Sequence, residues 1–496
     1  MQKKQIIFTI TVLCLIVLLF LITAGCVRDE LRLISEKLND YEITLSLHTE
    51  DNTLSGHTKL RYTNGSDSSV SALEFRLIPN AYREDAKNPA VDKTARNEAY
   101  PDGLSYGGIT VTAVKIDGET ADFSITGDDE DVLSVPLGKE LFLNDSTEAE
   151  ITYSVRLANV RHRLGYSDGI YNLANVYPVL CYEENGTFIR HPYTAIGDPF
   201  VTPAANYSVT FIVPEGFTVA HSGDLKEKTV SDGSVTYRFE QKCIRDFSLC
   251  ASEEFSVLSA VKDKTEIKYF YRKDSDPDST LRLISDCFGF FSSSFGKYPY
   301  GTYCVAETTL AAAGGMEYPN LVFVSDDLKR DSFNKVVIHE TAHQWWYGLV
   351  GNDQFNEAWL DEGLAEYSVI LFYKAFPDYG DAAETLKNSY KRYKLFYDVI
   401  INYKKDLDTS MSRPLTDFPN AQSYAVITYL KGMLMTDSLY DTVGEKRFSK
   451  ALRRYFEAGK YSIATPELFI SCFEKEYGSD MKKWFSSWLN GNAVIG

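Results

Sequence analysis

Apolar and polar residues alternate along several short segments in the first half of the chain. The alternation is clearest in residues 41–47, 150–155, 208–213 and 235–239. A period of two residues is typical of β-strands that bury one face. Turn-forming pairs, among them Asn64-Gly65, lie between these segments. We therefore expect an N-terminal all-β domain over residues 41–258, built as a sandwich or a saddle-shaped sheet layer.

A helical pattern replaces this alternation in the second half of the chain. Residues 279–296 have the apolar spacing of a helix, and residues 303–306 form a short apolar run that predicts a strand. Helical stretches dominate from Ser332 onward. These patterns predict an α+β multidomain chain, in which residues 259–496 form a mostly α domain with a small sheet.

The first 25 residues have the pattern of a targeting segment. Two lysines precede an uncharged run, residues 6–25, that ends directly before Cys26. This run predicts either a lipoprotein signal, cleaved before Cys26 and acylated there, or an uncleaved helix that crosses the membrane once. In both cases residues 26–40 form a linker, and the rest of the chain lies on the extracytoplasmic face of the cell membrane.

Composition narrows the possible functions. The chain has 496 residues, with 51 Lys and Arg against 69 Asp and Glu, and a formal net charge of −18. An acidic chain without a basic run beyond its first residues argues against nucleic acid as a partner.

An exported protein could pair its cysteines, but the six that follow Cys26 are too scattered for a compact disulfide framework or a zinc ribbon. They are Cys181, Cys243, Cys250, Cys287, Cys304 and Cys472.

The main candidate for chemistry is the segment His339-Glu340-Thr341-Ala342-His343. Two histidines four residues apart face the same side of a helix, where both can bind one metal ion. Glu340 lies between them and can accept a proton from water at that metal. The alternative for this segment alone is an exposed helix face with two unliganded histidines.

A third ligand is available after eighteen intervening residues. Glu362 lies in the segment Trp359-Leu360-Asp361-Glu362-Gly363, which is predicted to begin the next helix. Two histidines, one carboxylate and a water form the ligand set of a catalytic rather than a structural zinc. Glu366 follows one helical turn later. It either accepts the free ring N–H of a ligand histidine or is an ordinary solvated carboxylate.

Three motifs together resemble a known family. The HExxH segment with Glu362 after eighteen residues is similar to the zinc site of the aminopeptidase N-like gluzincins. Gly314-Gly315-Met316-Glu317-Tyr318 is similar to their GxMEN exopeptidase motif, and Tyr429-Leu430-Lys431-Gly432 resembles their Y-x-K-G segment. The chain looks like a short, bacterial, membrane-anchored member of this family. The resemblance implies that the mostly α domain is a thermolysin-like catalytic domain.

The resemblance also implies a role for each motif residue. His339, His343 and Glu362 are expected to hold one Zn²⁺, and Glu340 is expected to act as the general base. In this reading Tyr429 donates its hydroxyl to the oxyanion of the tetrahedral intermediate, with Tyr424 as the nearest competitor for that role.

The GxMEN-like motif is expected to bind the substrate. Glu317 would bind the free α-ammonium of a peptide, while the backbone around Gly314, Gly315 and Met316, on an edge strand, would pair with the substrate chain. The implied function is a zinc-dependent aminopeptidase that removes N-terminal residues from peptides by attack of zinc-activated water. Two alternatives remain at this point: an endopeptidase of the same gluzincin class, and a non-catalytic membrane lipoprotein that uses the fold for binding.

Some features depart from the family pattern. Tyr318 stands where the motif has asparagine, which puts the contacts of that amide in doubt. Family members present a Gln or Glu from the β domain beside the substrate amine, but the matching stretch, residues 171–175, offers neither. Longer members add a C-terminal helical domain over the active site, so we expect a more open site here, or one covered by the β domain or another chain.

Overall fold

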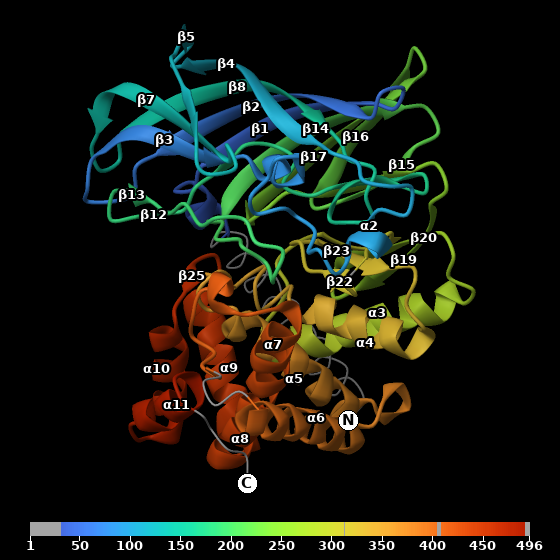
Figure 1. Ribbon diagram of the computed structural model, residues 1–496, viewed down its shortest axis with the longest axis vertical. Helices are drawn as coiled ribbons and strands as arrows, with labels where there is room; N and C mark the ends of the chain where they lie inside the picture. Colours follow the sequence, from blue (N-terminus) through green and yellow to red (C-terminus); the bar gives the residue numbers. More distant parts are fainter. Residues whose placement is uncertain (1–30, 312, 404–407, 492–496) are drawn as a thin grey trace, which may run out of the picture.

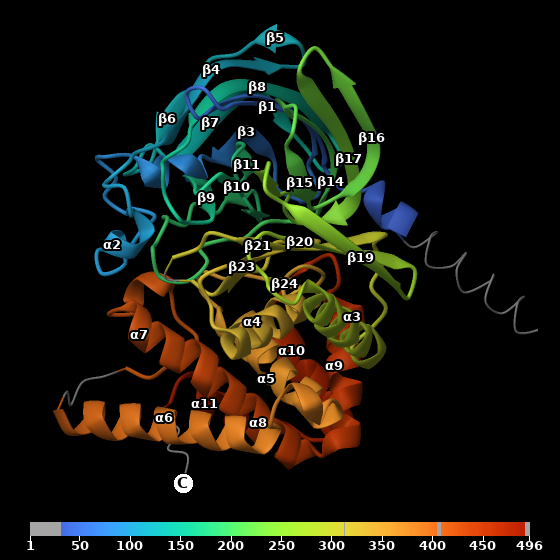
Figure 2. The same cartoon turned by 90° about the vertical axis from the view of Figure 1, so that its right-hand side faces the viewer.

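The computed structural model describes residues 31–311, 313–403 and 408–491. A β-rich part at the top of the molecule is followed by a helical part at the bottom, and a five-stranded sheet lies between them (Figures 1 and 2). This confirms the predicted order of an all-β domain followed by a mostly helical domain.

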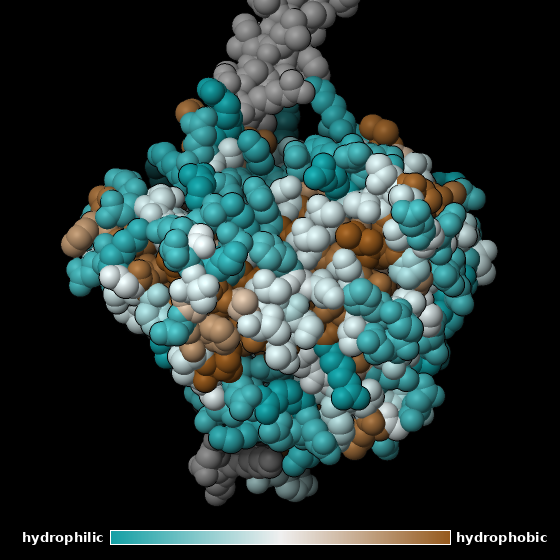
Figure 3. Space-filling model, turned by 90° about the horizontal axis from the view of Figure 1, so that it is seen from above, coloured by the Kyte–Doolittle hydropathy of each residue, from teal (hydrophilic) through white to brown (hydrophobic). Residues whose placement is uncertain are grey.

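The β domain is built on one large sheet of eight strands. In spatial order these are β16 (Asp224–Ser231), β17 (Ser234–Ile244), β14 (Ala205–Pro214), β1 (Asp40–His48), β2 (Thr53–Thr63), β8 (Ser146–Arg156), β4 (Gly108–Ile116) and β5 (Glu119–Thr120). Buried and exposed positions alternate along β1 and β2, as the sequence pattern predicts. The outer side carries mostly hydrophilic and intermediate side chains, with hydrophobic ones in separate groups (Figure 3). The sheet therefore buries only one face.

Smaller sheets complete the β domain on the buried side of the large sheet. One contains β11 (Val179–Leu180), β3 (Val70–Arg76), β7 (Val132–Leu141) and β6 (Ser124–Thr126). Another contains β15 (Thr218–His221), β18 (Leu249–Ser252), β10 (Ile170–Leu173) and β9 (Leu164–Ser167). Side chains from these sheets and the large sheet form one continuous hydrophobic core.

The five-stranded sheet joins the two parts. Its order is β19 (Ser256–Lys262), β20 (Thr265–Tyr271), β21 (Thr302–Thr308), β23 (Leu321–Ser325) and β22 (Gly315–Met316). Cys304 and Phe323 pack into the core of the β domain, whereas Tyr303 and Val322 pack against the helices. Because both faces are covered, every residue of β21 and β23 is buried. β19 spans residue 258, where the sequence pattern places the end of the β domain.

The helices cover the other face of this sheet. They are α3 (Pro277–Ser294), α4 (Arg330–Ala342), α5 (Trp359–Ala375), α6 (Ala382–Tyr403), α7 (Ala421–Tyr424), α8 (Gly432–Val443), α9 (Glu445–Gly459), α10 (Pro466–Tyr477) and α11 (Lys482–Leu489). A π-helix, Ala425–Lys431, connects α7 to α8. α3 begins two residues before the predicted Ser279, because the Asp276 side chain caps it by accepting from the backbone N–H of Ser279.

Two sequence predictions concern residues that the structure does not describe. The signal or anchor over residues 1–25 and the lipid site at Cys26 lie outside the described residues. Within the described ranges, none of the helices is both long enough and apolar enough to cross a membrane.

The six cysteines after Cys26 are all buried and free. Within the same ranges the fold therefore uses them as small core residues rather than as disulfides.

Candidate active site

The HExxH segment lies at the C-terminal end of α4. His339 and Glu340 are in the last turn of this helix, and His343 is its C-cap residue, still with helical backbone angles. The N–H of His343 donates to the carbonyl of His339, so the helical spacing extends through both histidines. The two imidazoles therefore point to the same side, and both are buried, with 7% and 1% of their surface exposed.

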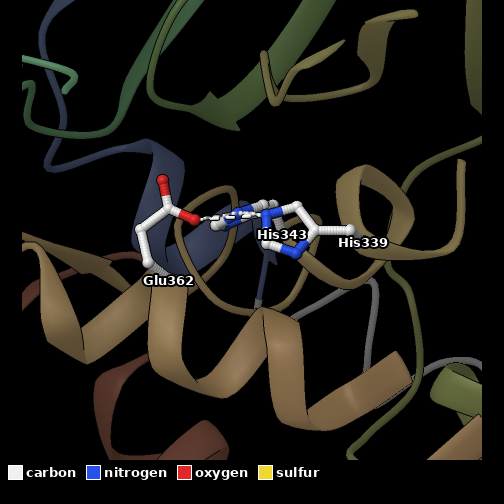
Figure 4. A group of neighbouring side chains, drawn as sticks. All are labelled: His339, His343 and Glu362. Atoms are coloured by element: carbon white, nitrogen blue, oxygen red, sulfur yellow. Dashed lines mark hydrogen bonds and ion pairs between the residues drawn. The ribbon is translucent and has the colours of Figure 1, made fainter. Parts of the chain in front are cut away.

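Glu362 reaches the same point from the first turn of α5. Its Oε2 atom lies 3.1 Å from Nε2 of His339 and 3.2 Å from Nε2 of His343, and the two nitrogens are 3.0 Å apart. Figure 4 shows the three side chains pointing toward one another. Ligands at about 2.0–2.1 Å from a tetrahedral zinc would be about 3.3 Å apart, so the three donor atoms fit that ion.

The three donor atoms also need a positive charge between them. Nδ1 of His343 donates its proton to the carbonyl of Trp346 at 2.8 Å, which leaves a lone pair on Nε2. Two imidazole lone pairs and a carboxylate oxygen at this spacing repel one another unless a positive charge lies between them. When that positive charge is a proton on His343, burial still raises the pKa of Glu362, but the charge and hydrogen bonds from both histidines lower it overall, to about 2. The site therefore favours an ionised Glu362.

Glu366 lies beside the first histidine and is buried, which excludes its interpretation as an ordinary solvated carboxylate. It is 8% exposed, and its Oε1 atom lies 3.5 Å from Nδ1 of His339. Lys335, one helical turn before His339, forms an ion pair of 2.9 Å with the same carboxylate. Burial raises the pKa of Glu366, but Lys335 and His339 lower it overall. The contact with His339 is electrostatic, because Nδ1 of His339 makes no hydrogen bond to the described residues.

Glu340 points from α4 toward the edge strand β22. A side-chain carbon built at Gly315 of β22 would lie 2.5 Å from Oε1 of Glu340. Glycine at position 315 therefore leaves the space that the carboxylate occupies. Burial, opposed in part by His343, raises the pKa of Glu340 well above its ordinary value. A carboxylate with a raised pKa is suited to accept a proton and return it.

The GxMEN-like segment lies beside the metal ligands on the edge of the five-stranded sheet. Met316 of β22 pairs with Phe323 of β23, and the carbonyl of Gly314 accepts from the N–H of Ser325. The opposite edge of β22 has no neighbouring strand among the described residues. This is the edge-strand position that the sequence analysis expects for a backbone that pairs with substrate.

Glu317 follows β22 directly and is 3% exposed. The side-chain amide of Gln354 donates to Oε1 of Glu317 at 2.8 Å and to Oδ2 of Asp361 at 2.7 Å. Burial, with Asp198 as the next largest cause, raises the pKa of Glu317 well above its ordinary value. Glu317 is thus a fixed carboxylate in a site that has an excess of negative charge.

Asp198 is the site residue that the sequence analysis missed. It comes from a loop of the β domain, and one of its carboxylate oxygens lies within 4.8 Å of carboxylate oxygens of Glu317 and Glu362. Arg163 donates to its Oδ1 atom at 2.5 Å. Residues 171–175 do not supply this group, because Asn172 donates instead to the backbone carbonyls of His162 and Thr309. No local pattern around Asp198 signals its position, which depends on how the two domains pack.

Tyr429 reaches the site from the π-helix. Its hydroxyl donates to Oε1 of Glu362, and its ring stacks on that of His339 with 5.8 Å between centroids. The competing Tyr424 contacts the Tyr429 ring edge-on, and its buried hydroxyl makes no hydrogen bond to the described residues. The structure thus places Tyr429 against a metal ligand and Tyr424 next to Tyr429. Single-turn π-helices are often found at functional sites.

Comparison with known proteins agrees with this geometry. The family described as "Peptidase family M1 domain" matches residues 280–488, which include all the residues of the HExxH, Glu362 and Tyr429 site. The chain contains a peptidase M1 domain. The family resemblance is confirmed at the level of this domain.

Curated relatives of the M1 domain are aminopeptidases. Aminopeptidase N of Streptomyces lividans is 25% identical over 230 residues, 43% of this chain and 26% of that protein. Aminopeptidase B of Mus musculus is 28% identical over 319 residues, 59% and 47% of the two chains. Aminopeptidase N of Bos taurus is 26% identical over 365 residues, 67% and 36% of the two chains. The matches thus span from about a quarter to about half of these relatives.

Solved structures share the fold over nearly the whole chain. The M1 zinc metallopeptidase from Deinococcus radiodurans has a TM-score of 0.67 and 18% identity, covering 92% of this chain and 95% of that one. A mutant of the Deinococcus radiodurans enzyme bound to a Tyr-Ser-Ala substrate has a TM-score of 0.65 and 17% identity, covering 93% and 96%. The two-domain architecture around the M1 domain is therefore a known one.

The residue that departs from the motif, Tyr318, is completely buried beside the M1 site. Its backbone carbonyl accepts from the side-chain amide of Gln344, whose Oε1 accepts from the N–H of Asn320. These contacts fix the main chain that follows Glu317. The Tyr318 hydroxyl makes no hydrogen bond to the described residues. Tyr318 therefore positions the segment through its backbone rather than through a side-chain amide.

Proposed function

We propose that the protein is a zinc-dependent aminopeptidase that removes residues from the free N-terminus of peptides. The observation that carries this proposal is the convergence of three metal-binding atoms, from His339, His343 and Glu362, next to two further buried carboxylates, Glu317 and Asp198. The aminopeptidase relatives of the M1 domain support the same function.

The residues present fit zinc in number, type and spacing. Zn²⁺ bound there would act as a Lewis acid toward water and the peptide carbonyl. Glu340 takes a proton from the attacking water and returns it to the amine that leaves when the peptide bond breaks. Its position beside Gly315 directs its carboxylate to the edge strand on which the substrate lies.

Glu317 and Asp198 explain why the enzyme would act only at an N-terminus. The α-ammonium of a peptide is positively charged, and two buried carboxylates stabilise it through charge-assisted hydrogen bonds. Arg163 neutralises only part of this charge, since its carboxylate partner within the described ranges is Asp198 and not Glu317. A mid-chain amide carries no charge, so its burial beside these carboxylates gains nothing that offsets desolvation.

Tyr429 is placed to stabilise the oxyanion that forms as water adds to the peptide carbonyl. Its hydroxyl already lies at Glu362, the carboxylate ligand. Burial and then the charge of Glu362 raise the pKa of Tyr429 well above its ordinary value, so the hydroxyl keeps its proton and can donate it in a hydrogen bond.

We also propose that the enzyme is attached to the extracytoplasmic face of the cell membrane through its N-terminal segment. The support comes from the sequence, namely the uncharged run over residues 6–25 and Cys26 directly after it. Mass spectrometry of the mature N-terminus tests this. A diacylated Cys26 supports the lipoprotein form, an intact N-terminus in the membrane fraction supports the single-span form, and release of unmodified soluble protein contradicts both.

The enzymatic proposal is tested with a panel of aminoacyl-fluorogenic substrates and with matched peptides that have free or acetylated N-termini. We expect cleavage of the first bond in the free peptides, loss of activity with a chelator, and recovery with zinc. Equal cleavage of acetylated peptides would instead show an endopeptidase of the same class. Zinc binding without cleavage of any substrate would favour the non-catalytic lipoprotein.

A further inference from the structure

A buried arginine connects the β domain to the turn that follows the zinc-binding helix. Arg245 lies between β17 and β18 and is 1% exposed. Its guanidinium donates to the backbone carbonyls of Tyr347 (2.8 Å), Leu349 (3.2 Å) and Ser462 (2.7 Å) in the helical domain, and of Thr202 (2.9 Å) in the β domain. A buried guanidinium is stable only when carbonyls such as these four accept its hydrogen bonds. Arg245 therefore fixes the four carbonyls relative to one another.

The side chain of Tyr347, in the same turn, makes a second contact with the β domain. The Tyr347 hydroxyl donates to Oδ2 of Asp246 at 2.5 Å, and its backbone N–H donates to the carbonyl of Val350. Tyr347 has a φ of 134°, a conformation that side-chain-bearing residues rarely adopt. Such a conformation persists only where the surrounding contacts enforce it. Arg245 and Asp246, both from the β domain, supply those contacts.

This turn also contains the hydrogen-bond partner of a zinc ligand. The carbonyl of Trp346 accepts from Nδ1 of His343 at 2.8 Å. That carbonyl belongs to the same planar peptide group as the N–H of Tyr347, so the φ angle of Tyr347 orients it relative to the rest of the turn. Gly351 leaves room for this arrangement, because a side-chain carbon there would lie 2.2 Å from Cζ of Arg245.

We infer that Arg245 and Asp246 are positioning residues for the zinc site. They hold Tyr347, whose peptide group holds the imidazole of His343, so that docking of the β domain sets the affinity for zinc. The inference rests on the zinc binding in the proposed function and not on peptide cleavage. Because coupling between two binding events is reciprocal, zinc must in turn stabilise the contact between the two domains.

The test compares zinc affinity in variants that keep every metal ligand. Tyr347→Phe removes only the hydroxyl that reaches Asp246, and Arg245→Lys removes the branched donor set. We expect both to bind zinc at least about tenfold more weakly in competition with a chelating dye, the size found for residues that support metal ligands. Tyr237→Phe is the matched control, since it removes a buried hydroxyl that donates to the carbonyl of Phe217 in the β domain. It should leave zinc affinity unchanged.

A second readout does not depend on activity. Removing zinc from the unmodified protein should increase amide hydrogen exchange in residues 345–351 and in residues 245–248. Unchanged zinc affinity in folded Tyr347→Phe, or equal exchange with and without zinc, overturns the inference. Zinc binding that weakens as expected in a protein that cleaves no peptide would overturn the proposed function alone. A folded protein that binds no zinc would overturn both.

Discussion

Gly363 and Gly432 contact each other through their backbones. A side-chain carbon built at Gly432 would lie 2.9 Å from Cα of Gly363, and one built at Gly363 would lie 3.1 Å from Cα of Gly432. Gly363 follows Glu362 on α5, and Gly432 begins α8 directly after the π-helix with Tyr429. The close approach of these two glycines allows the hydroxyl of Tyr429 to reach Glu362. Two glycines of separate motifs thus together allow the contact between Tyr429 and Glu362.

Replacement of Gly432 by alanine should therefore impair the enzyme. Alanine favours a helix by about 1 kcal/mol over glycine, but here its methyl group would push α5 and α8 apart. We expect lower thermal stability and at least tenfold lower kcat. Gly289→Ala in α3 is the control, since the added methyl group meets only the flexible end of Lys262. Wild-type kcat in Gly432→Ala would show that the contact does not position Tyr429.

Glu340→Gln should abolish turnover and leave zinc bound. Glutamine keeps the shape of the side chain but cannot accept the proton, so kcat should fall by about 10²–10⁴-fold or more. Glu307→Gln is a control, because Glu307 is a buried carboxylate that accepts from three backbone N–H groups, those of residues 272–274, none of which belongs to the metal site. Metal analysis and kinetics of both variants show whether Glu340 is the general base. Loss of zinc from Glu340→Gln would mean that the substitution disturbs the site as a whole.

Glu317→Gln and Asp198→Asn should weaken the binding of free N-termini. Each removes one negative charge that the substrate ammonium contacts, so KM for aminoacyl substrates should rise by about tenfold or more. Zinc content should not change. Asp129→Asn provides the comparison, since Asp129 is a buried carboxylate of the β domain that accepts from the backbone N–H groups of Lys87 and Asn88. An unchanged KM in Asp198→Asn would remove Asp198 from the amine site.

Tyr429→Phe and Tyr424→Phe separate the two neighbouring tyrosines. Loss of a hydroxyl that stabilises the oxyanion should lower kcat by about 10²–10³-fold with little effect on KM. We expect this for Tyr429→Phe, because its hydroxyl lies at Glu362. Tyr424→Phe should retain most activity. The reverse result would reassign the role to Tyr424.

Two buried histidines should make the fold sensitive to acid. Burial lowers the pKa of His162 and of His221 from 6.5 to about 3, so both are neutral in the folded protein. The unfolded chain binds a proton at each below pH 6.5, so stability is full above that pH and is lost as pH falls toward 3. Each histidine contributes about 1.4 kcal/mol per pH unit in that window.

Urea unfolding at pH 7.0, 5.5 and 4.5 measures this slope. The double variant His162→Gln, His221→Gln should show a smaller loss between pH 6.5 and 4.5 than the unmodified protein. Release of zinc in acid affects both proteins equally and therefore cancels in the comparison. Identical slopes would show that these histidines do not govern the acid response.

The sequence predicted those parts of the site in which spacing along the chain determines spacing in the structure. His339 and His343 are one helical turn apart, so the helix alone brings them together. Glu362 is predicted by its spacing from the HExxH segment, and Glu317 by the resemblance of its segment to the GxMEN motif, although Glu317 follows the edge strand β22 and lies on no helix. Asp198 could not be predicted, because the packing of the β domain on the helices brings it to Glu317 and Glu362. The late start predicted for α3 has a local cause, because its cap Asp276 lies outside the apolar pattern.

The residues that support the site were also beyond sequence reasoning. Arg245 and Asp246 lie more than ninety positions before His343, and nothing in the local pattern shows that they reach the turn at Tyr347. For Glu366 the sequence left two interpretations open. The structure favours the one in which it lies at His339, because burial and Lys335 both follow from the packing of α4 on α5.

The central claim is that His339, His343 and Glu362 hold one zinc ion. Metal analysis of the purified protein, together with the folded variant Glu362→Ala, tests it most directly. We predict one zinc per chain in the unmodified protein and loss of most of it in Glu362→Ala. A properly folded protein that contains no transition metal and takes none up on addition of zinc would contradict the claim.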